Sequence, residues 1–216
     1  MKIKTLILTF SPGHRIVEDA SKLRGFFATK FNEYALLHQH IADKLVYKYP
    51  LIQYKMIDGA PLIFGINEGV DVLKEIYDKY DEICLGDSKY NIKERGMIIK
   101  DQEFGISKKF LKYRFATPWF ALNQDNYQKY YMSDMDEQHT LLRKILIGNL
   151  LSVSKSIGYE VVDEIKTDIK VKPQKRNLKN TVIMGFAGTF IVNFNLPGYM
   201  GLGKSVSRGF GAVQKV

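Results

Sequence analysis

The dipeptide Asp58-Gly59, set between two apolar runs, limits the fold of this chain more than any other short feature. Residues 51–57 and 60–66 flank it, and Asp-Gly between such runs is a strong β-hairpin signal. The other expected elements are a strand at residues 3–8, a helix with an apolar face from Ile16 to Phe31, a helix capped by Asn67, and strands at 82–85 and 97–99. This β-α-β-β-α-β order is typical of the ferredoxin-like arrangement.

The second half of the chain repeats this order up to its last helix. The expected elements are a strand at residues 111–115, a helix from the capping box Ser133/Asp136 to Gly158, strands at 165–171 and 182–194, and a short strand at 212–213. A glycine-rich stretch, residues 198–211, stands where the second helix would be. We therefore expect an α+β protein of two tandem ferredoxin-like (RRM-like) domains, at 1–105 and 106–216, the second lacking its last helix.

The charge of the chain indicates what it binds. Lys and Arg number 32 against 23 Asp and Glu, a formal net charge of +9 with a pI near 9.4. Without long basic tails, this excess favours a polyanionic partner, although a charge of this size also aids solubility. Cys84 is the only cysteine, which excludes a disulfide framework or a cysteine-built zinc site within one chain.

The first ten residues are apolar but resemble neither a signal peptide nor a membrane anchor. Lys2 and Lys4 interrupt them, and Ser11-Pro12-Gly13 ends them without a small-residue cleavage pattern. No run approaches the roughly 18 apolar residues that a membrane helix needs. We expect a cytoplasmic protein with no membrane partner.

The glycine-rich stretch matches the nucleotide-binding pattern G-x-x-x-x-G-K-[ST] between Gly198 and Ser205. Its context argues against a nucleotide hydrolase. That motif must open a helix, yet only 11 residues follow Ser205, and Gly209 and Gly211 would break a helix within two turns. No chain remains for further parallel strands or for a magnesium-binding Asp.

The same stretch can instead bind the phosphates of an RNA backbone, through the same kind of interactions that would hold a nucleotide. Glycines let the backbone approach a phosphodiester and point successive N–H groups at it, while basic and hydroxyl side chains add charge and donors. The candidate RNA-binding residues are Gly201, Gly203, Lys204, Ser205, Ser207, Arg208, Gly209 and Gly211. The alternative is a flexible connection, but the strand that follows implies that both ends are anchored.

The run Gly201-Leu-Gly-Lys-Ser-Val-Ser-Arg-Gly-Phe-Gly211, between a long strand and a short last one, resembles the CRISPR-associated endoribonucleases that process precursor CRISPR RNA, the Cas-six family of the RAMP superfamily. Met184-Gly-Phe-Ala-Gly188 resembles the strand that precedes this loop in the family. The resemblance is sharp over residues 182–213 and weaker around the first helix. It implies repeat-specific cleavage without a metal or other cofactor.

Two histidines, His38 and His40, follow the first expected helix. Imidazoles gain and lose protons near neutral pH, so such a pair supplies the base and the acid that metal-free RNA cleavage needs. The base takes the proton of a 2′-hydroxyl, which attacks the adjacent phosphate, and the acid protonates the leaving 5′-oxygen. The bland alternative is two ordinary histidines in a helix–strand connection.

The resemblance places the catalytic histidine of the family in this region, often helped by Tyr, Ser or Lys. On that basis Tyr34, Lys44 and Tyr47 are candidate helpers, and which histidine is the base stays open. A zinc site is also conceivable because H-x-H is a common ligand pair. The possible further ligands, His14, His139, Asp43 and Cys84, stand at no recognisable spacing, so we expect no metal.

A basic segment precedes the long strand of the second half. Lys170, Lys172, Lys175, Arg176 and Lys179 gather around Pro173 in an expected strand-to-strand loop. Such a loop can follow RNA phosphates, although charge runs are more often solvated surface. Trp119 follows a strand and is expected in the core rather than stacked on a base.

Three functions remain open at this stage. The first is a metal-independent endoribonuclease that cuts CRISPR repeat RNA in the precursor transcript. The second is a non-catalytic RNA-binding subunit of a CRISPR effector complex, and the third is an unrelated RNA- or nucleotide-binding protein. Repeat RNA is the expected partner, and other effector proteins or a second copy of the chain are compatible with the first two.

Overall fold

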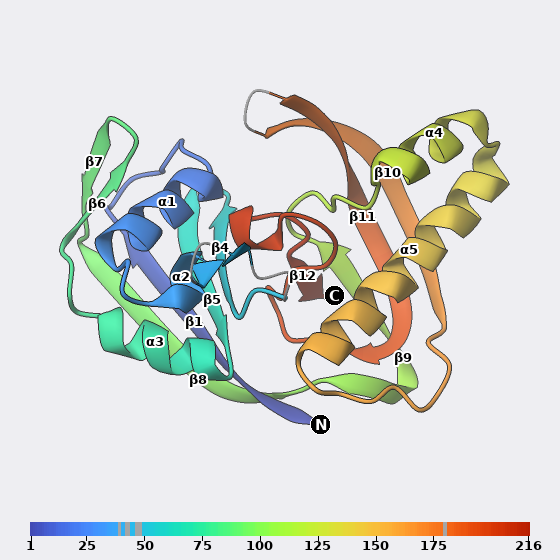
Figure 1. Cartoon of the computed structure of the whole chain (residues 1–216), viewed down its shortest axis with the longest axis horizontal. Helices are drawn as coiled ribbons and strands as arrows, with labels where there is room; N and C mark the ends of the chain where they lie inside the picture. The colour runs from blue at the N-terminus through green and yellow to red at the C-terminus, as the bar shows by residue number, and fades with distance from the viewer. Residues whose placement is uncertain (39, 42–43, 46–48, 179–180) are drawn as a thin grey trace. The chain divides into compact units, whose positions relative to one another are not determined.

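The computed structural model describes residues 1–38, 40–41, 44–45, 49–178 and 181–216 (Figure 1). The chain divides into two compact units. The N-terminal unit comprises residues 2–102 together with residues 206–209. The C-terminal unit comprises Met1, residues 103–205 and residues 210–216. Four residues of the glycine-rich stretch therefore belong to the unit that is remote from them in sequence.

The N-terminal unit is built on a four-stranded sheet with the order β4-β5-β1-β8. Its elements are β1 (Lys2–Ser11), α1 (Ala20–Lys30), α2 (Ala35–His38), β2 (His40–Ile41), β3 (Lys44–Leu45), β4 (Ile52–Ile57), β5 (Ala60–Ile66), α3 (Glu68–Ile76), β6 (Glu82–Leu85), β7 (Ser88–Asn91) and β8 (Glu94–Glu103). Numbered within the motif, the strand order is 2-3-1-4. This is the ferredoxin-like order expected from the sequence.

The hairpin of β4 and β5 forms where Asp58-Gly59 predicted it. The φ angles of Asp58 and Gly59 are +52° and +79°, so both central residues lie in the left-handed region that a two-residue type I′ turn requires. The strands pair from Ile57 with Ala60 to Ile52 with Gly65. β5 also pairs with β1, which places the hairpin inside the sheet rather than beside it.

Several boundaries of the N-terminal unit differ from the sequence prediction. Helix α1 begins at Ala20, because Asp19 caps it by accepting from the N–H groups of Ser21 and Lys22, and Ile16 lies buried ahead of it. Asn67 does precede α3, but with a φ of +48° its side chain makes no capping bond.

The strand expected at residues 82–85 forms with those bounds as β6, but it lies outside the main sheet. β6 pairs only with β7, in a separate two-stranded hairpin. The last strand of the main sheet is β8, which is longer and mostly exposed. The strand expected at residues 97–99 lies within β8, whose other residues are mostly polar because one apolar face is enough for an edge strand.

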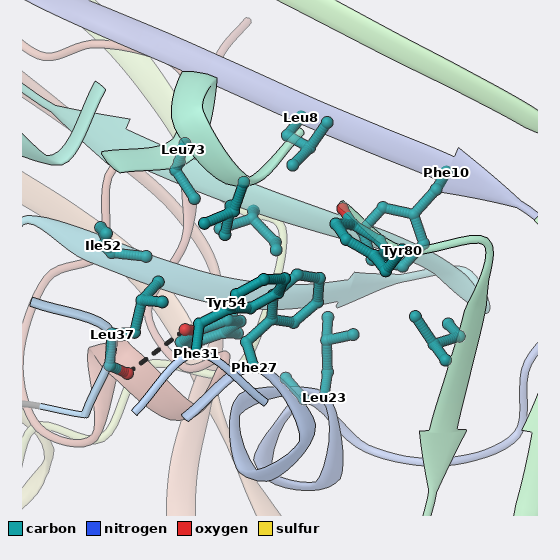
Figure 2. Packing of buried hydrophobic residues seen from close by; sticks show 14 of the residues in the cluster. Leu8, Phe10, Leu23, Phe27, Phe31, Leu37, Ile52, Tyr54, Leu73 and Tyr80 are labelled. Atoms are coloured by element: carbon teal, nitrogen blue, oxygen red, sulfur yellow. Dashed lines mark hydrogen bonds between the residues drawn. The ribbon is translucent and has the colours of Figure 1, made fainter. Parts of the chain in front are cut away.

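The core of the N-terminal unit lies between the sheet and the helices. Figure 2 shows Phe27 of α1 and Phe31, the residue that follows this helix, packed beside Tyr54 of β4 and Tyr80. The rings of Phe27 and Tyr80 meet edge to face with centroids 5.0 Å apart. The apolar stripe that predicted α1 is therefore the stripe that the sheet buries.

The C-terminal unit has a second sheet, with the order β10-β11-β9-β12. Its elements are β9 (Gly105–Phe115), α4 (Gln124–Met132), α5 (Met135–Ser156), β10 (Thr167–Leu178), β11 (Thr181–Asn195) and β12 (Val213–Lys215); η1 (Val206–Arg208) is a 3-10 turn that belongs to the N-terminal unit. The order is again 2-3-1-4, with one long helix, α5, along the sheet (Figure 1). The expected α+β fold, with a loop in place of the second unit's last helix, is confirmed.

Two expectations for the C-terminal unit are wrong. Ser133 ends α4, a helix that the polar sequence did not reveal, and Asp134 rather than Ser133 caps α5 by accepting from the N–H of Glu137 at 2.9 Å. The basic residues around Pro173 lie in strand β10 rather than in a loop, since β10 pairs with β11 from Thr167 to Leu178.

The core prediction for Trp119 is confirmed. The residue is fully buried, stacks on Phe115 with ring centroids 5.1 Å apart, and donates its Nε1–H to Asn149 at 3.0 Å. Within the described ranges, none of the helices is long and apolar enough to pass through a membrane.

Candidate nucleic-acid interface

In the C-terminal unit, the glycine-rich stretch is a rigid, hydrogen-bonded loop. The N–H of Leu202 donates to Gly211 O, the N–H of Gly211 donates to Pro118 O, both at 2.9 Å, and the N–H of Lys204 donates to Phe120 O at 3.0 Å. Gly203 and Gly211 have φ angles of +87° and +67°, which favour glycine. These bonds argue against a flexible connection.

Residues 206–209 of the same stretch pack within the N-terminal unit. Gly209 has a φ of +100°, and a Cβ placed on it would lie 2.6 Å from the Cβ of Ala20 on α1. Lys55 of β4 is fully buried and donates its Nζ to Val206 O at 3.1 Å. Burial lowers the pKa of this amine to about 7. A buried lysine thus holds the turn that carries Ser207 and Arg208.

A groove of about 760 Å³ lies beside the loop in the C-terminal unit. It is lined by Phe120, Leu122, Asn123, Gln124, Asp125, Tyr127, Gln128, Val182, Ile183, Met184, Lys204 and Ser205. Burial lowers the pKa of Lys204, and the charge of Asp125 partly opposes this shift. Two of the expected RNA-binding residues, Lys204 and Ser205, therefore border a concave surface with amide and aromatic neighbours.

His38 is the last residue of the short helix α2. Its Nε2 lies 3.0 Å from Asn32 O, and its own carbonyl accepts from Nη2 of Arg24 at 2.7 Å. The carbonyl of the preceding residue, Leu37, accepts from the hydroxyl of Tyr54 at 3.2 Å (Figure 2). Two side chains of the N-terminal unit therefore fix the backbone on which His38 stands.

The other expected catalytic residues lie near α2 in the chain but are described unequally. His40 of β2 pairs with Leu45, and Lys44 of β3 pairs with Ile41, so the two short strands form an antiparallel pair soon after His38 in the chain. Tyr47 lies outside the described residues. Tyr34 comes before α2, and its hydroxyl donates to Glu75 of α3.

The hydroxyl of Tyr34 is already hydrogen-bonded to another side chain, which sets it apart from a residue available as a general acid or base. The hydrogen bond to Glu75 raises the pKa of Tyr34 and lowers that of Glu75. The Nζ of Lys79 lies 5.9 Å from the centroid of the tyrosine ring. Tyr34 thus already has partners on the α3 side.

The basic strand β10 presents its cations to solvent. Lys172, Lys175 and Arg176 are exposed and lie opposite residues 187, 184 and 183 of β11. Lys179 lies outside the described residues. The expected RNA-binding cations that are described here therefore lie on the exposed surface of the two-stranded ribbon formed by β10 and β11.

The described residues contain no group of three or more His, Cys, Asp or Glu side chains placed to hold a metal ion. His139, one of the considered ligands, lies on α5 and pairs with Asp168 at 3.0 Å. Sequence reasoning missed Arg24 and Lys55. Lys55 carries a weak signal, because it is the one charged residue in strand β4, whereas nothing local marks Arg24.

Two ferredoxin-like units, with a rigid glycine-rich loop in place of the last helix of the second, form a fold class that the chain shares with a solved structure described as an RAMP protein binding different RNA substrates, at 14% identity over 100% of both chains and a TM-score of 0.59. Family models narrow the class. The Cas6b N-terminal domain matches residues 1–103, and the Cas6b C-terminal domain matches residues 105–216. The chain belongs to the Cas6b family.

Individual relatives agree with this assignment. A solved structure described as Cas6b is 40% identical and covers 100% of both chains with a TM-score of 0.95. Another, described as the CRISPR RNA processing endoribonuclease Cas6b, is 37% identical over 100% of both chains with a TM-score of 0.83. An uncharacterized protein of Methanocaldococcus jannaschii is 39% identical over 143 residues, which are 66% of this chain and 97% of that protein.

Proposed function

We propose that this chain is a metal-independent endoribonuclease that cuts CRISPR repeat RNA within the precursor transcript. The observation that carries the proposal is the 37% identity, over the full length of both chains, to a structure described as a CRISPR RNA processing endoribonuclease. The geometry around His38 and the rigid loop with Lys204 and Arg208 supports it.

The proposed reaction uses the RNA's own 2′-hydroxyl as the nucleophile. One histidine of the pair His38 and His40 takes the hydroxyl proton, and the oxygen bonds to the adjacent phosphorus. The bond from phosphorus to the 5′-oxygen breaks, and the other histidine gives that oxygen a proton. The products are a 2′,3′-cyclic phosphate and a 5′-hydroxyl, so the histidine pair is left with its protons exchanged.

The remaining residues bind rather than react in this proposal. Loop N–H groups together with Lys204, Ser205, Ser207 and Arg208 hold the RNA backbone, and the exposed cations of β10 follow further phosphates. Lys44 and Tyr47 stand close enough in sequence to the histidines to stabilise charge on the phosphate. Because the hydroxyl of Tyr34 is bonded to Glu75, Tyr34 has a supporting role, and Tyr34→Phe is expected to lower the cleavage rate less than either histidine substitution does.

The experiment is cleavage of the repeat RNA that belongs to the same genome, with EDTA present. His38→Ala and His40→Ala are each expected to slow cleavage by about 10²–10⁴-fold while RNA binding stays within a few fold. His139→Gln is the matched control, because it removes a histidine of α5 that pairs with Asp168 of β10 in the C-terminal unit. It should cut at the wild-type rate.

Other outcomes of this experiment contradict the proposal in distinct ways. Wild-type protein that binds the repeat but never cuts it is a non-catalytic RNA-binding subunit. Cleavage that stops with EDTA contradicts metal independence. Equal binding of the repeat and a scrambled RNA of the same length contradicts repeat specificity.

A further inference from the structure

Arg24, on α1, is held against the backbone of α2 and still has donors to spare. Its Nη2 donates to His38 O at 2.7 Å. Its Nε is buried and has no hydrogen-bond partner within the described part of the chain. A buried guanidinium donor without a partner is costly, so its presence calls for an explanation.

Arg208 brings a second guanidinium to the same place. It lies on η1, which packs against α1 and β4 in the N-terminal unit, with Gly209 against Ala20 and Val206 O bonded to Lys55. Burial and then the charge of Arg208 lower the pKa of Arg24, so the two like charges are close enough to repel each other.

No carboxylate among the described residues balances these two arginines. Arg95, in the same unit, shows what a structural arginine looks like here. It bonds Asp81 at 2.8 Å and the Tyr77 carbonyl at 3.1 Å, and stands over the ring of Tyr80. Neither Arg24 nor Arg208 forms an ion pair with a described acidic residue. Two half-buried guanidinium groups without an acid form a site for an anion.

We propose that Arg24 and Arg208 form a clamp for a single backbone phosphate of the RNA, next to His38, and that Arg24 also positions the backbone that carries His38. The clamp rests on the proposed function, because it names where the RNA strand runs relative to that histidine. Nothing in the sequence pattern marks Arg24 for this role.

The physical argument for one shared phosphate is geometric. Arg24 is committed through Nη2 to His38 O, which leaves its other donors for a ligand. A phosphate presents several acceptor oxygens and binds guanidinium groups through paired hydrogen bonds. An anion between the two arginines removes their repulsion, so each makes the other's contact stronger. Lys55 and Gly209 are then the residues that set η1 at the right place.

The test of the clamp is a double-variant cycle measured as RNA binding. The probe is the repeat RNA with 2′-methoxy groups throughout, which lacks the attacking hydroxyl and so reports binding alone. Arg24→Gln and Arg208→Gln are each expected to weaken binding about tenfold and to reduce the slope of log K against log salt by about 0.7, the value for one phosphate of a single strand. Lys22→Gln, an equal charge change at an exposed position of α1, is the control and should leave the slope unchanged.

The double variant decides whether the phosphate is shared. A single clamp predicts that Arg24→Gln with Arg208→Gln lowers the slope by no more than about 0.7 and weakens binding by clearly less than the product of the single effects. A slope reduced by about 1.4 with multiplied losses means two separate phosphates and overturns the clamp. Single variants with the wild-type slope overturn it as well.

The positioning role of Arg24 has a readout that needs no RNA. The chain has four histidines, so the imidazole signals of His38 can be assigned by NMR. Arg24→Gln is expected to move the His38 signals, whereas Arg208→Gln leaves them in place. Unmoved His38 signals in a folded Arg24→Gln variant overturn the positioning role. Thermal unfolding followed by circular dichroism confirms that both variants fold, and Arg208→Gln removes no side-chain hydrogen bond or ion pair among the described residues.

Failure of the clamp and failure of the nuclease proposal are distinguishable. Wild-type protein that binds the methoxy RNA but leaves unmodified repeat RNA intact contradicts the nuclease proposal. The slopes of log K against log salt for the arginine variants still show whether the clamp exists. Efficient cleavage of unmodified RNA together with unchanged slopes in Arg24→Gln and Arg208→Gln contradicts the clamp alone.

Discussion

Gly203 tests whether the glycine-rich loop is as rigid as its hydrogen bonds imply. The residue has a φ of +87°, and a Cβ added to it would lie 2.7 Å from both Phe120 O and Nε1 of Trp119. Those two atoms already take part in bonds, from Lys204 N at 3.0 Å and to Asn149 at 3.0 Å. Gly203→Ala therefore strains the backbone and crowds two hydrogen bonds at once.

The expected loss of stability follows from these contacts. A side chain in the left-handed region costs about 1–2 kcal/mol. Weakening the bonds from Lys204 to Phe120 and from Trp119 to Asn149 costs up to about 1 kcal/mol each. We expect Gly203→Ala to lower the free energy of unfolding by about 3 kcal/mol. For a chain of this size, that corresponds to a Tm lower by about 6–12 °C.

The assay is urea unfolding followed by tryptophan fluorescence. Trp119 is the only tryptophan and touches the added Cβ, so its emission reports the C-terminal unit directly. Gly198→Ala is the matched control, because a Cβ on Gly198 meets nothing within 4 Å and its φ lies outside the left-handed region. Its stability should stay the same or rise by up to about 1 kcal/mol. A loss below about 1 kcal/mol for Gly203→Ala, or an equal loss for both variants, would refute the rigid-loop reasoning.

Two further predictions concern single buried or capping side chains. Because burial lowers the pKa of Lys55 to about 7, the unfolded state binds more protons than the folded state between pH 7 and about 10.5, and stability should rise with pH in that window by up to about 1.4 kcal/mol per pH unit. Lys55→Met should abolish this contribution in urea titrations at pH 7 and 9, and an unchanged pH dependence contradicts it. Asp134→Ala should lower the free energy of unfolding by about 1 kcal/mol through the lost bond to Glu137 N, whereas Ser133→Ala should change it little; equal losses would restore Ser133 as the cap.

Local patterns in the sequence predicted the helices and turns that are specified by residues close together in the chain. Asp58-Gly59 specified its turn because both residues tolerate positive φ, and the stripe from Leu23 to Phe31 specified α1 because a sheet must bury one helix face. Helix α4 escaped prediction because it buries little besides Tyr130. The strand at 82–85 was predicted correctly, but its pairing with β7 was not, because alternation predicts a strand without naming its partner.

The candidate site divides in the same way. His38, Lys204 and Arg208 were predicted as site residues from the sequence, because a histidine pair and a glycine-rich basic run indicate their chemistry by residue type alone. Arg24 and Lys55 were not found, because each matters through a partner far away in the chain. Lys55 bonds Val206, 151 residues later, and the charge of Arg208 lies close enough to Arg24 to lower its pKa.

By itself, the sequence determined the order of elements, the basic charge, the identity of the family and the position of the loop near residue 203. Those features depend on short-range patterns, which can be recognised in the sequence without knowledge of the fold. Only the tertiary structure decided that residues 206–209 pack in the N-terminal unit, that a buried lysine holds them, and that two arginines come close there with no acidic partner among the described residues. Such contacts join residues separated by more than 150 positions, and no periodicity in a chain records which distant residues become neighbours.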